Sequence, residues 1–220
     1  VDRRQRQMCI RDRVNMDKFK SMTELKELTK EGKDWEIEFE NRSSMVTILA
    51  IHGGGIEPAT TELAYTIAHR GNYNYFSFKG MRSEGNNELH VTSTHYDDQI
   101  ALDLVRGSPR TVAIHGCEGN ESVAYIGGSD DRLIELITES LEDIGISVQE
   151  APHHISGTQE NNIVNMTQTQ GGVQLELTDQ LRKELFKNRK SSRKNRKNKD
   201  NWDDLMYDFA DAMKKAIERA

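Results

Sequence analysis

The hydrophobic and polar positions of this chain follow two periods that alternate along the sequence. Short stretches that are continuously apolar, or apolar at every second position, are typical of β-strands. We predict strands at residues 35–40, 45–51, 73–79, 88–94, 110–115, 123–126, 146–149 and 172–177. Segments with helical spacing lie at residues 21–32, 58–70, 100–105, 130–144 and 178–186. This alternation predicts an α/β fold with an open mixed, mostly parallel sheet flanked by helices.

The predicted strand at residues 45–51 is followed by a histidine and a short glycine-rich turn. After His52 come three glycines, then Glu57, and then Pro58, which can open a helix. The continuously apolar strand is typical of one buried on both faces. Ligands of open α/β sheets bind beyond the carboxyl ends of the strands. His52 and Glu57 on this turn therefore look like two ligands of a metal ion.

A second apolar strand, at residues 110–115, also ends in a histidine, His115. The carboxyl ends of parallel strands share one rim of a sheet, so His115 is a candidate third ligand. Catalytic zinc sites use three protein ligands and keep one position for water. His115 is equally compatible with a histidine of the core. Other side chains compete as ligands, namely His90, His95, His153, His154 and Cys117.

The glycine turn after His52 also resembles the oxyanion loop of esterases. The chain has no Gly-x-Ser-x-Gly elbow, which argues against a serine hydrolase. It also lacks Gly-Lys-Ser/Thr and Gly-x-Gly-x-x-Gly, so the turn does not indicate a phosphate-binding loop.

Glu176 stands out on the predicted strand at residues 172–177. The apolar residues of this strand share one face, and Glu176 lies on the other face with Gln174. A carboxylate on a largely buried strand is costly unless it is paired or used. Two roles remain open from the pattern alone: a general base, or an ion pair with a nearby arginine such as Arg182.

Several ordered motifs resemble the bacteriophage poly-γ-glutamate hydrolases, whose homologues occur in Bacillus genomes and prophages. The similarity covers residues 16–188. It is carried by the strand that ends at His115 and by the motifs His52-Gly-Gly-Gly-Ile-Glu57-Pro58, Leu89-His-Val-Thr-Ser-Thr94, Asn161-Asn-Ile-Val-Asn165 and Gly172-Val-Gln-Leu-Glu-Leu-Thr-x-x-Leu-Arg182.

The resemblance implies a zinc carboxypeptidase-like fold and a hydrolase of γ-glutamyl amide bonds. It implies one Zn²⁺ ion held by His52, Glu57 and His115. Glu176 would match the glutamate that activates the zinc-bound water. The expected substrate is anionic poly-γ-glutamate. The alternative substrate for the same site is a small N-acyl amino acid, such as an acyl-glutamate, or a peptide.

An anionic substrate calls for amide or cationic donors in the site. The candidates for substrate binding are Asn162, Asn165 and His95, with Arg82 and Lys79 as weaker ones. A solvated turn residue is the preferred interpretation of Arg82, and His95 is equally compatible with a structural role. Met166 stands where the family often has an arginine, so one carboxylate contact is expected to be absent or replaced.

The two ends of the chain differ from its centre. Residues 1–15 carry five arginines without periodicity, and we expect them to be non-native or disordered, with Met16 as the start. The hydrolase domain is expected at residues 16–188. A basic linker follows at residues 189–200, within a run at 187–199 that holds eight Lys or Arg and no acid. A terminal helix is expected at residues 201–220.

The composition narrows the remaining choices. A net charge of −6 argues against affinity of the whole molecule for nucleic acid, although a non-enzymatic phage protein that binds nucleic acid through residues 187–199 is the alternative function. Two distant cysteines do not form a disulfide framework. No stretch has membrane-spanning length. We therefore expect a monomer without membrane contact, cytoplasmic as synthesised and released by host lysis.

Overall fold

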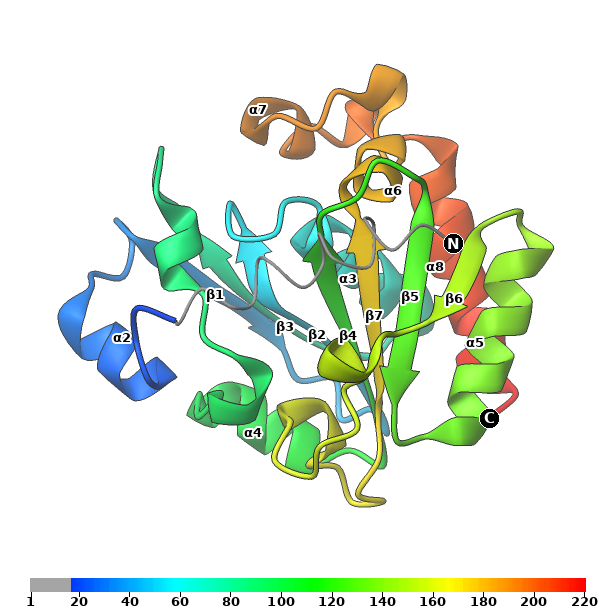
Figure 1. Ribbon diagram of the computed structural model, residues 1–220, viewed down its shortest axis with the longest axis horizontal. Coiled ribbons are helices and arrows are strands. Elements are labelled where there is room, and N and C mark those ends of the chain that lie inside the picture. Colours follow the sequence, from blue (N-terminus) through cyan, green and yellow to red (C-terminus); the bar gives the residue numbers. More distant parts are fainter. Residues whose placement is uncertain (1–16) are drawn as a thin grey trace.

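The computed structural model describes residues 17–220, and the expectation for residues 1–15 lies outside this range. The described residues form a seven-stranded sheet in the order β1-β3-β2-β4-β7-β5-β6 (Figure 1). Its strands are β1 Trp35–Glu40, β2 Val46–Gly54, β3 Asn74–Gly80, β4 Arg110–Cys117, β5 Val123–Gly128, β6 Ser147–Glu150 and β7 Val173–Thr178. Most neighbouring strands are parallel, and only β1/β3 and β5/β7 are antiparallel. The predicted mixed, mostly parallel α/β sheet is thereby confirmed.

Helices cover both faces of the sheet (Figure 1). They are α2 Met22–Leu28, α3 Thr60–Gly71, α4 Gln99–Arg106, α5 Asp131–Asp143, α6 Asp179–Glu184, α7 Arg193–Arg196 and α8 Asp204–Glu218. One face packs against α3, α5 and α8, and we call the apolar residues between them the first core. The other face packs against α2 and α4 and forms the second core. The two faces therefore bury different sets of side chains from the same strands.

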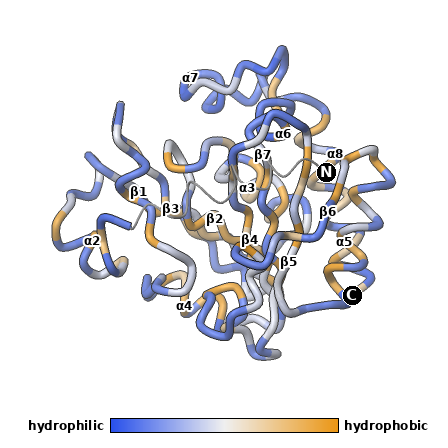
Figure 2. Tube along the Cα trace, viewed as in Figure 1, coloured by the Kyte–Doolittle hydropathy of each residue, from blue (hydrophilic) through white to orange (hydrophobic). Residues whose placement is uncertain are grey.

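The inner strands distribute their residues between the two cores by simple alternation. Ile48 and Ala50 of β2 belong to the first core, whereas Leu49 and Ile51 belong to the second. Figure 2 shows the apolar colour along these inner strands and the polar colour of the segment around α7. A strand buried on both faces is continuously apolar, as its sequence indicates.

The terminal helix α8 packs into the first core through Phe209 and Met213, which are buried against α3 and α5. The preceding basic segment is also attached to the body of the protein. The guanidinium of Arg196 in α7 is buried and pairs with Glu62 of α3. The division into a hydrolase domain, a linker and a terminal helix stays a prediction. No helix among residues 17–220 is both long and apolar enough to span a bilayer.

Residues 88–94 differ from the predicted strand. They fall in two 3₁₀ turns, η1 Asn86–Leu89 and η2 Ser93–His95, and in the extended residues between them. Backbone N–H groups of this segment are satisfied locally, because His90 donates to the Asn87 carbonyl and Thr92 donates to the Asp17 carboxylate. The apolar alternation reflects burial of Leu89 and Val91 in the second core, without a partner strand.

Candidate metal centre

A β-bulge in β2 sets the direction of His52. Ala50 pairs with Ser77 of β3, and Gly53 pairs with Lys79. Two residues of β2, Ile51 and His52, therefore face a single residue of β3. Without the bulge, His52 would continue the side of Ala50 and enter the first core. The extra residue re-aims its imidazole, which lies against the second core and contacts the Val91 carbonyl through Nε2 at 2.7 Å.

His115 reaches the same face from β4 without any irregularity. Ala113 lies in the second core and Ile114 in the first, so alternation turns His115 towards the second core. The Nδ1 atoms of His115 and His52 lie 3.1 Å apart, and both imidazoles are buried. The two strand-end histidines that the sequence singles out therefore meet at the rim.

Glu57 joins this pair from the glycine turn. Its Oε1 atom lies 3.2 Å from Nδ1 of His52, and its Oε2 atom lies 3.6 Å from Nδ1 of His115. The carboxylate is fixed by the Gly116 N–H, which donates to Oε2 at 2.8 Å. The turn itself closes through the Glu57 N–H, which donates to the His52 carbonyl at 2.9 Å. The five-residue spacing thus folds Glu57 back over its own strand.

The helix after this turn begins later than the sequence indicates. Pro58 does not occupy the first helical position, because Ala59 adopts a left-handed conformation with φ 82° and α3 begins at Thr60. The extra residues leave the Glu57 carboxylate on the turn, where it faces the histidines.

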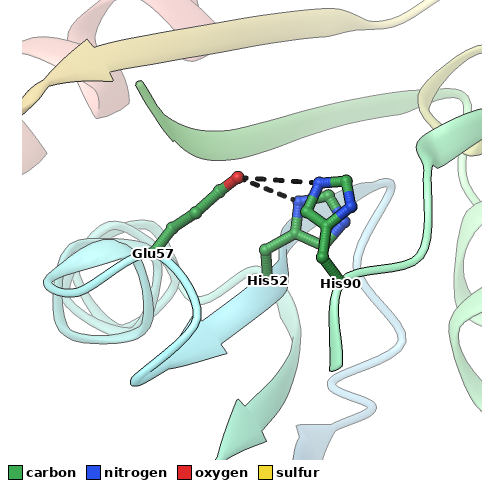
Figure 3. A group of neighbouring side chains, drawn as sticks. All are labelled: His52, Glu57 and His90. Atoms are coloured by element: carbon green, nitrogen blue, oxygen red, sulfur yellow. Dashed lines mark ion pairs between the residues drawn. The ribbon is translucent and has the colours of Figure 1, made fainter. Parts of the chain in front are cut away.

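His90 is a fourth member of the group. Its ring stacks on His52 with centroids 3.9 Å apart, and its Nε2 atom lies 4.0 Å from Oε1 of Glu57 (Figure 3). Each of His52, Glu57 and His90 offers a ligand atom within 4.8 Å of the other two. The Nδ1 atom of His90 lies 2.6 Å from the Asp17 carboxylate. Sequence reasoning had only the short Leu-His-Val motif as a signal for this residue.

These donors suit a zinc ion. Ligand atoms about 2.0–2.1 Å from a tetrahedral metal are separated by about 3.3 Å. The Nδ1 atoms of His52 and His115 lie 3.1 Å apart, and each has one Glu57 oxygen at a similar distance, Oε1 at 3.2 Å from His52 and Oε2 at 3.6 Å from His115. The His52 Nε2 contact with a backbone carbonyl leaves Nδ1 for a metal, as is usual for histidine ligands. His90 lies farther from Glu57 than either of the other histidines.

The surroundings shift the pKa values of Glu57 and His90, one by its histidine neighbours and the other mainly by burial. Burial works to raise the pKa of Glu57, but the charges and hydrogen bonds of His52 and His115 outweigh it and hold the pKa well below its usual value. Burial, and then the neighbouring His52, hold the pKa of His90 below its ordinary value despite the contact with Asp17. Metal ligands must be an ionised carboxylate and neutral imidazoles. The site keeps Glu57 ionised and His90 neutral near pH 7.

Glu176 lies beside His115 on the adjacent strand. The two residues are in register across β4 and β7, and Tyr125 of β5 is in register on the other side. Glu176 is fully buried. Arg182, the partner that the sequence leaves open, instead donates to Asp179 and to the carbonyls of Pro58, Leu177 and Cys117. The arrangement places a carboxylate next to the His52, Glu57 and His115 donors.

A chain of buried amides supports Glu176. The side-chain amide of Gln174 donates to Oε1 of Glu176 at 2.9 Å. Its own oxygen accepts from the Asn162 amide at 3.1 Å. Sequence reasoning placed Gln174 on the right face but gave it no role. The signal for it was the period-two pattern that sets Gln174 and Glu176 on one face.

The expected substrate contacts lie in different surroundings. The Asn165 amide is buried and donates to the carbonyls of Gly157 and Gln159. Arg82 is engaged by Asp34 and Glu88. His95 is exposed and lines a cavity of about 820 Å³ that also reaches His90 and Met166. The structure thus brings His95 and Met166 together near the centre, whereas Asn162 and Asn165 hold the loop before β7.

The family model of poly-γ-glutamate hydrolase matches residues 19–212 of the chain. The solved structure of a bacteriophage poly-γ-glutamate hydrolase superposes with a TM-score of 0.89 at 30% identity, covering 93% of this chain and 98% of that one. A zinc-free apo structure of YndL superposes with a TM-score of 0.83 at 29% identity, covering 92% and 98%. These matches confirm the expected zinc carboxypeptidase-like α/β fold.

Two proteins of Bacillus subtilis strain 168 are similar in sequence. The SPbeta prophage-derived protein YoqZ is 37% identical over 172 residues, which cover 77% of this chain and 62% of YoqZ. YndL is 32% identical over 174 residues, which cover 77% of this chain and 67% of YndL. The chain therefore spans less than two thirds of the length of YoqZ.

Proposed function

This chain belongs to the poly-γ-glutamate hydrolase family of enzymes, and from that premise we propose that it cleaves γ-glutamyl amide bonds of poly-γ-glutamate with one zinc ion. The observation that carries the proposal is the convergence of His52, Glu57 and His115 at one rim of the sheet, with Glu176 buried beside them. Three ligands and a neighbouring carboxylate are the elements of a metal-assisted amide hydrolase.

Each residue of the site has a distinct role in the proposed reaction. His52, Glu57 and His115 would hold the zinc ion. When bound, zinc supplies a Lewis acid that polarises the amide carbonyl and makes a water molecule more acidic. Glu176 accepts the proton of the attacking water and returns it to the leaving amine. The amide of Gln174 keeps the Glu176 carboxylate in place through its hydrogen bond to Oε1.

The substrate carries a free carboxylate on every residue, so the walls of the site should supply donors. Among the candidates, His95 has the most favourable place, because it is exposed in the cavity that reaches His90. The roles of Asn162, Asn165 and Arg82 in substrate binding stay predictions. The hydrogen bonds of Asn162 and Asn165 favour a role in shaping the loop before β7, and Arg82 is held by its ion pair with Asp34.

The proposal is tested by following the length of purified poly-γ-glutamate on incubation with the zinc-loaded protein. We expect the polymer to shorten, and we expect Glu176→Gln with full zinc content to leave it intact. Chromatography of the products separates internal cleavage from release of single glutamates. An intact polymer after incubation with the zinc-loaded, folded protein would refute the proposed activity. A small N-acyl-glutamate cleaved under the same conditions would then identify the alternative substrate.

A further inference from the structure

A groove of about 460 Å³ lies on the outer side of the glycine turn. Gly54, Gly55 and Pro58 form one wall, the end of β3 and the residues after it form another, and the segment around α7 forms the third. In Figure 1, α7 lies at the end of the molecule where β7 leads into α6. The turn that carries His52 and Glu57 is thus shared by the metal centre and the groove.

Six cations line this groove: Lys79, Arg82, Arg193, Arg196, Lys197 and Lys199. Three of them are neutralised by carboxylates. Lys79 pairs with Glu38, Arg82 with Asp34 and Glu88, and Arg196 with Glu62. The other three have no carboxylate within 4.0 Å in the part of the chain that the structure describes. The two acids that line the groove, Glu38 and Glu62, are both among these pairs, which leaves an excess of positive charge.

The basic segment is held in a defined position over the groove. The guanidinium of Arg196 is buried, and its Nη2 atom donates to the Gly54 carbonyl at 3.4 Å. Arg193 donates to the Met81 carbonyl at 2.9 Å. The ammonium of Lys199 lies 4.6 Å from the Tyr65 ring centroid and 5.6 Å from that of Trp202. These contacts hold Arg193 and Lys199 at the side of the groove, and Lys197, next to the buried Arg196, also lines it.

We propose that this groove is an accessory binding site for the carboxylates of a polyanionic chain that extends from the metal centre. The proposal rests on the proposed function, because it names where the distal part of the same polymer binds. A γ-linked polyglutamate carries one carboxylate per residue, so several successive residues can meet Arg193, Lys197 and Lys199. Cations held in fixed positions lose less side-chain entropy when they bind such a ligand.

A polycarboxylate suits the groove better than a nucleic acid does. The groove shares the glycine turn with the metal centre, so a polymer that leaves the centre over this turn meets the cations of the groove. Two aromatic rings line the groove, but Trp202 is buried and the Lys199 ammonium lies 4.6 Å from the Tyr65 centroid, where it would compete with a stacked base.

The test uses the full chain in which Arg193, Lys197 and Lys199 are all changed to Gln. The matched control changes Lys183, Lys190 and Lys194 to Gln, which removes the same charge from exposed positions outside the groove. At low salt we expect the groove variant to raise KM for long polymer roughly tenfold, because each exposed ionic contact contributes modestly. The increase should shrink for short oligomers and at high salt. The control should match the wild type.

The double variant Arg193→Gln/Lys197→Gln distinguishes weaker binding from a folding defect, because it keeps Lys199 packed on the rings of Tyr65 and Trp202. It should raise KM by a smaller factor with an unchanged melting temperature. Cleavage by groove variants with wild-type KM for long polymer would overturn the inference and leave the proposed function intact.

Measuring polymer binding without cleavage tests the accessory groove separately from the proposed hydrolase activity. Fluorescent poly-γ-glutamate should bind Glu176→Gln protein, and the groove substitutions should weaken that binding. If the wild-type protein binds the polymer more tightly than the groove variant but cleaves none of it, the accessory site is supported and the proposed function is refuted. Tighter groove-dependent binding of single-stranded DNA or RNA, which displaces the polymer, would overturn the inference in favour of a nucleic-acid site.

Discussion

His52 and His115 present their Nδ1 atoms to each other at 3.1 Å, although a regular β2 would turn them towards opposite faces of the sheet. The bulge between Ala50 and Gly53 brings them together. β-bulges often lie next to active sites, where they re-aim a side chain. The geometry of the candidate centre therefore depends on one extra residue in β2 as much as on the identity of its ligands.

Gly53 is the residue that allows the bulge to pack, so Gly53→Ala should disturb the centre. A Cβ atom at this position would lie 2.1 Å from the Thr61 hydroxyl and 2.9 Å from the Phe78 carbonyl. We expect the free energy of unfolding to fall by about 2 kcal/mol, which is typical of overpacking. Zinc affinity should fall with it, because the turn carries Glu57.

Denaturant unfolding and zinc titration check this prediction. Gly107→Ala is the matched control, since Gly107 has φ −77° and its nearest contact to an added Cβ would be 3.1 Å. An unchanged stability of Gly53→Ala would show that the bulge tolerates a side chain.

The ligand set can be distinguished from the alternative that includes His90. If His115 is a ligand, His115→Ala should weaken zinc binding by well over a hundredfold. His90→Ala should weaken it by only about tenfold, as expected for a residue that supports the ligands. Competition with a chromogenic chelator measures both affinities. The opposite order, with His90→Ala the more severe, would assign the third position to His90.

The carboxylate of Glu176 should be required for turnover but not for metal binding. Glu176→Gln keeps the shape of the side chain and removes its ability to accept a proton. We expect kcat to fall by about a thousandfold, within the range for loss of a general base. Zinc content measured by mass spectrometry should stay at the wild-type value. A variant that retains most of its activity would exclude Glu176 as the base.

The start of α2 predicts a pH dependence of stability. The Asp97 carboxylate accepts from the N–H groups of Met22 and Thr23, the first residues of that helix. Burial would raise the pKa of Asp97, but these hydrogen bonds and that of the Thr23 hydroxyl outweigh it and lower the pKa. The folded state thus binds the proton more weakly than the unfolded state. Its stabilisation is present above about pH 4 and is lost as the pH falls through the folded-state pKa.

Asp97→Asn should therefore lower the free energy of unfolding by about 1 kcal/mol at pH 7, as the loss of a helix cap does. The difference from the wild type should shrink below pH 4. Urea unfolding between pH 3 and pH 7 checks this, with Asp208→Asn on the exposed face of α8 as the control. A constant difference at every pH would contradict the assignment.

The sequence predicts the elements of the site better than their geometry. The strand ends at His52 and His115 are visible as apolar runs that stop at a histidine, and period two places Glu176 opposite the apolar face of β7. The bulge is invisible to such patterns, because an extra residue in a buried apolar strand leaves the run unbroken.

The segment at residues 88–94 shows a second limit of pattern reasoning. Leu89 and Val91 alternate as in a strand, but the Asp17 carboxylate, far away in sequence, binds the backbone at Thr92 and the ring of His90. Long-range contacts of this kind decide whether an apolar segment pairs with a sheet. They also bring His90, which the sequence offers only as one of several competing ligands, to within 4.0 Å of Glu57.

The central claim is that zinc bound at this centre drives cleavage of poly-γ-glutamate. Titration of metal-free protein with zinc, with the polymer length followed at each step, tests it most directly. We expect no cleavage without metal and activity that rises to a plateau at one zinc ion per chain. Cleavage at full rate by the metal-free protein, or an intact polymer at saturating zinc, would contradict it.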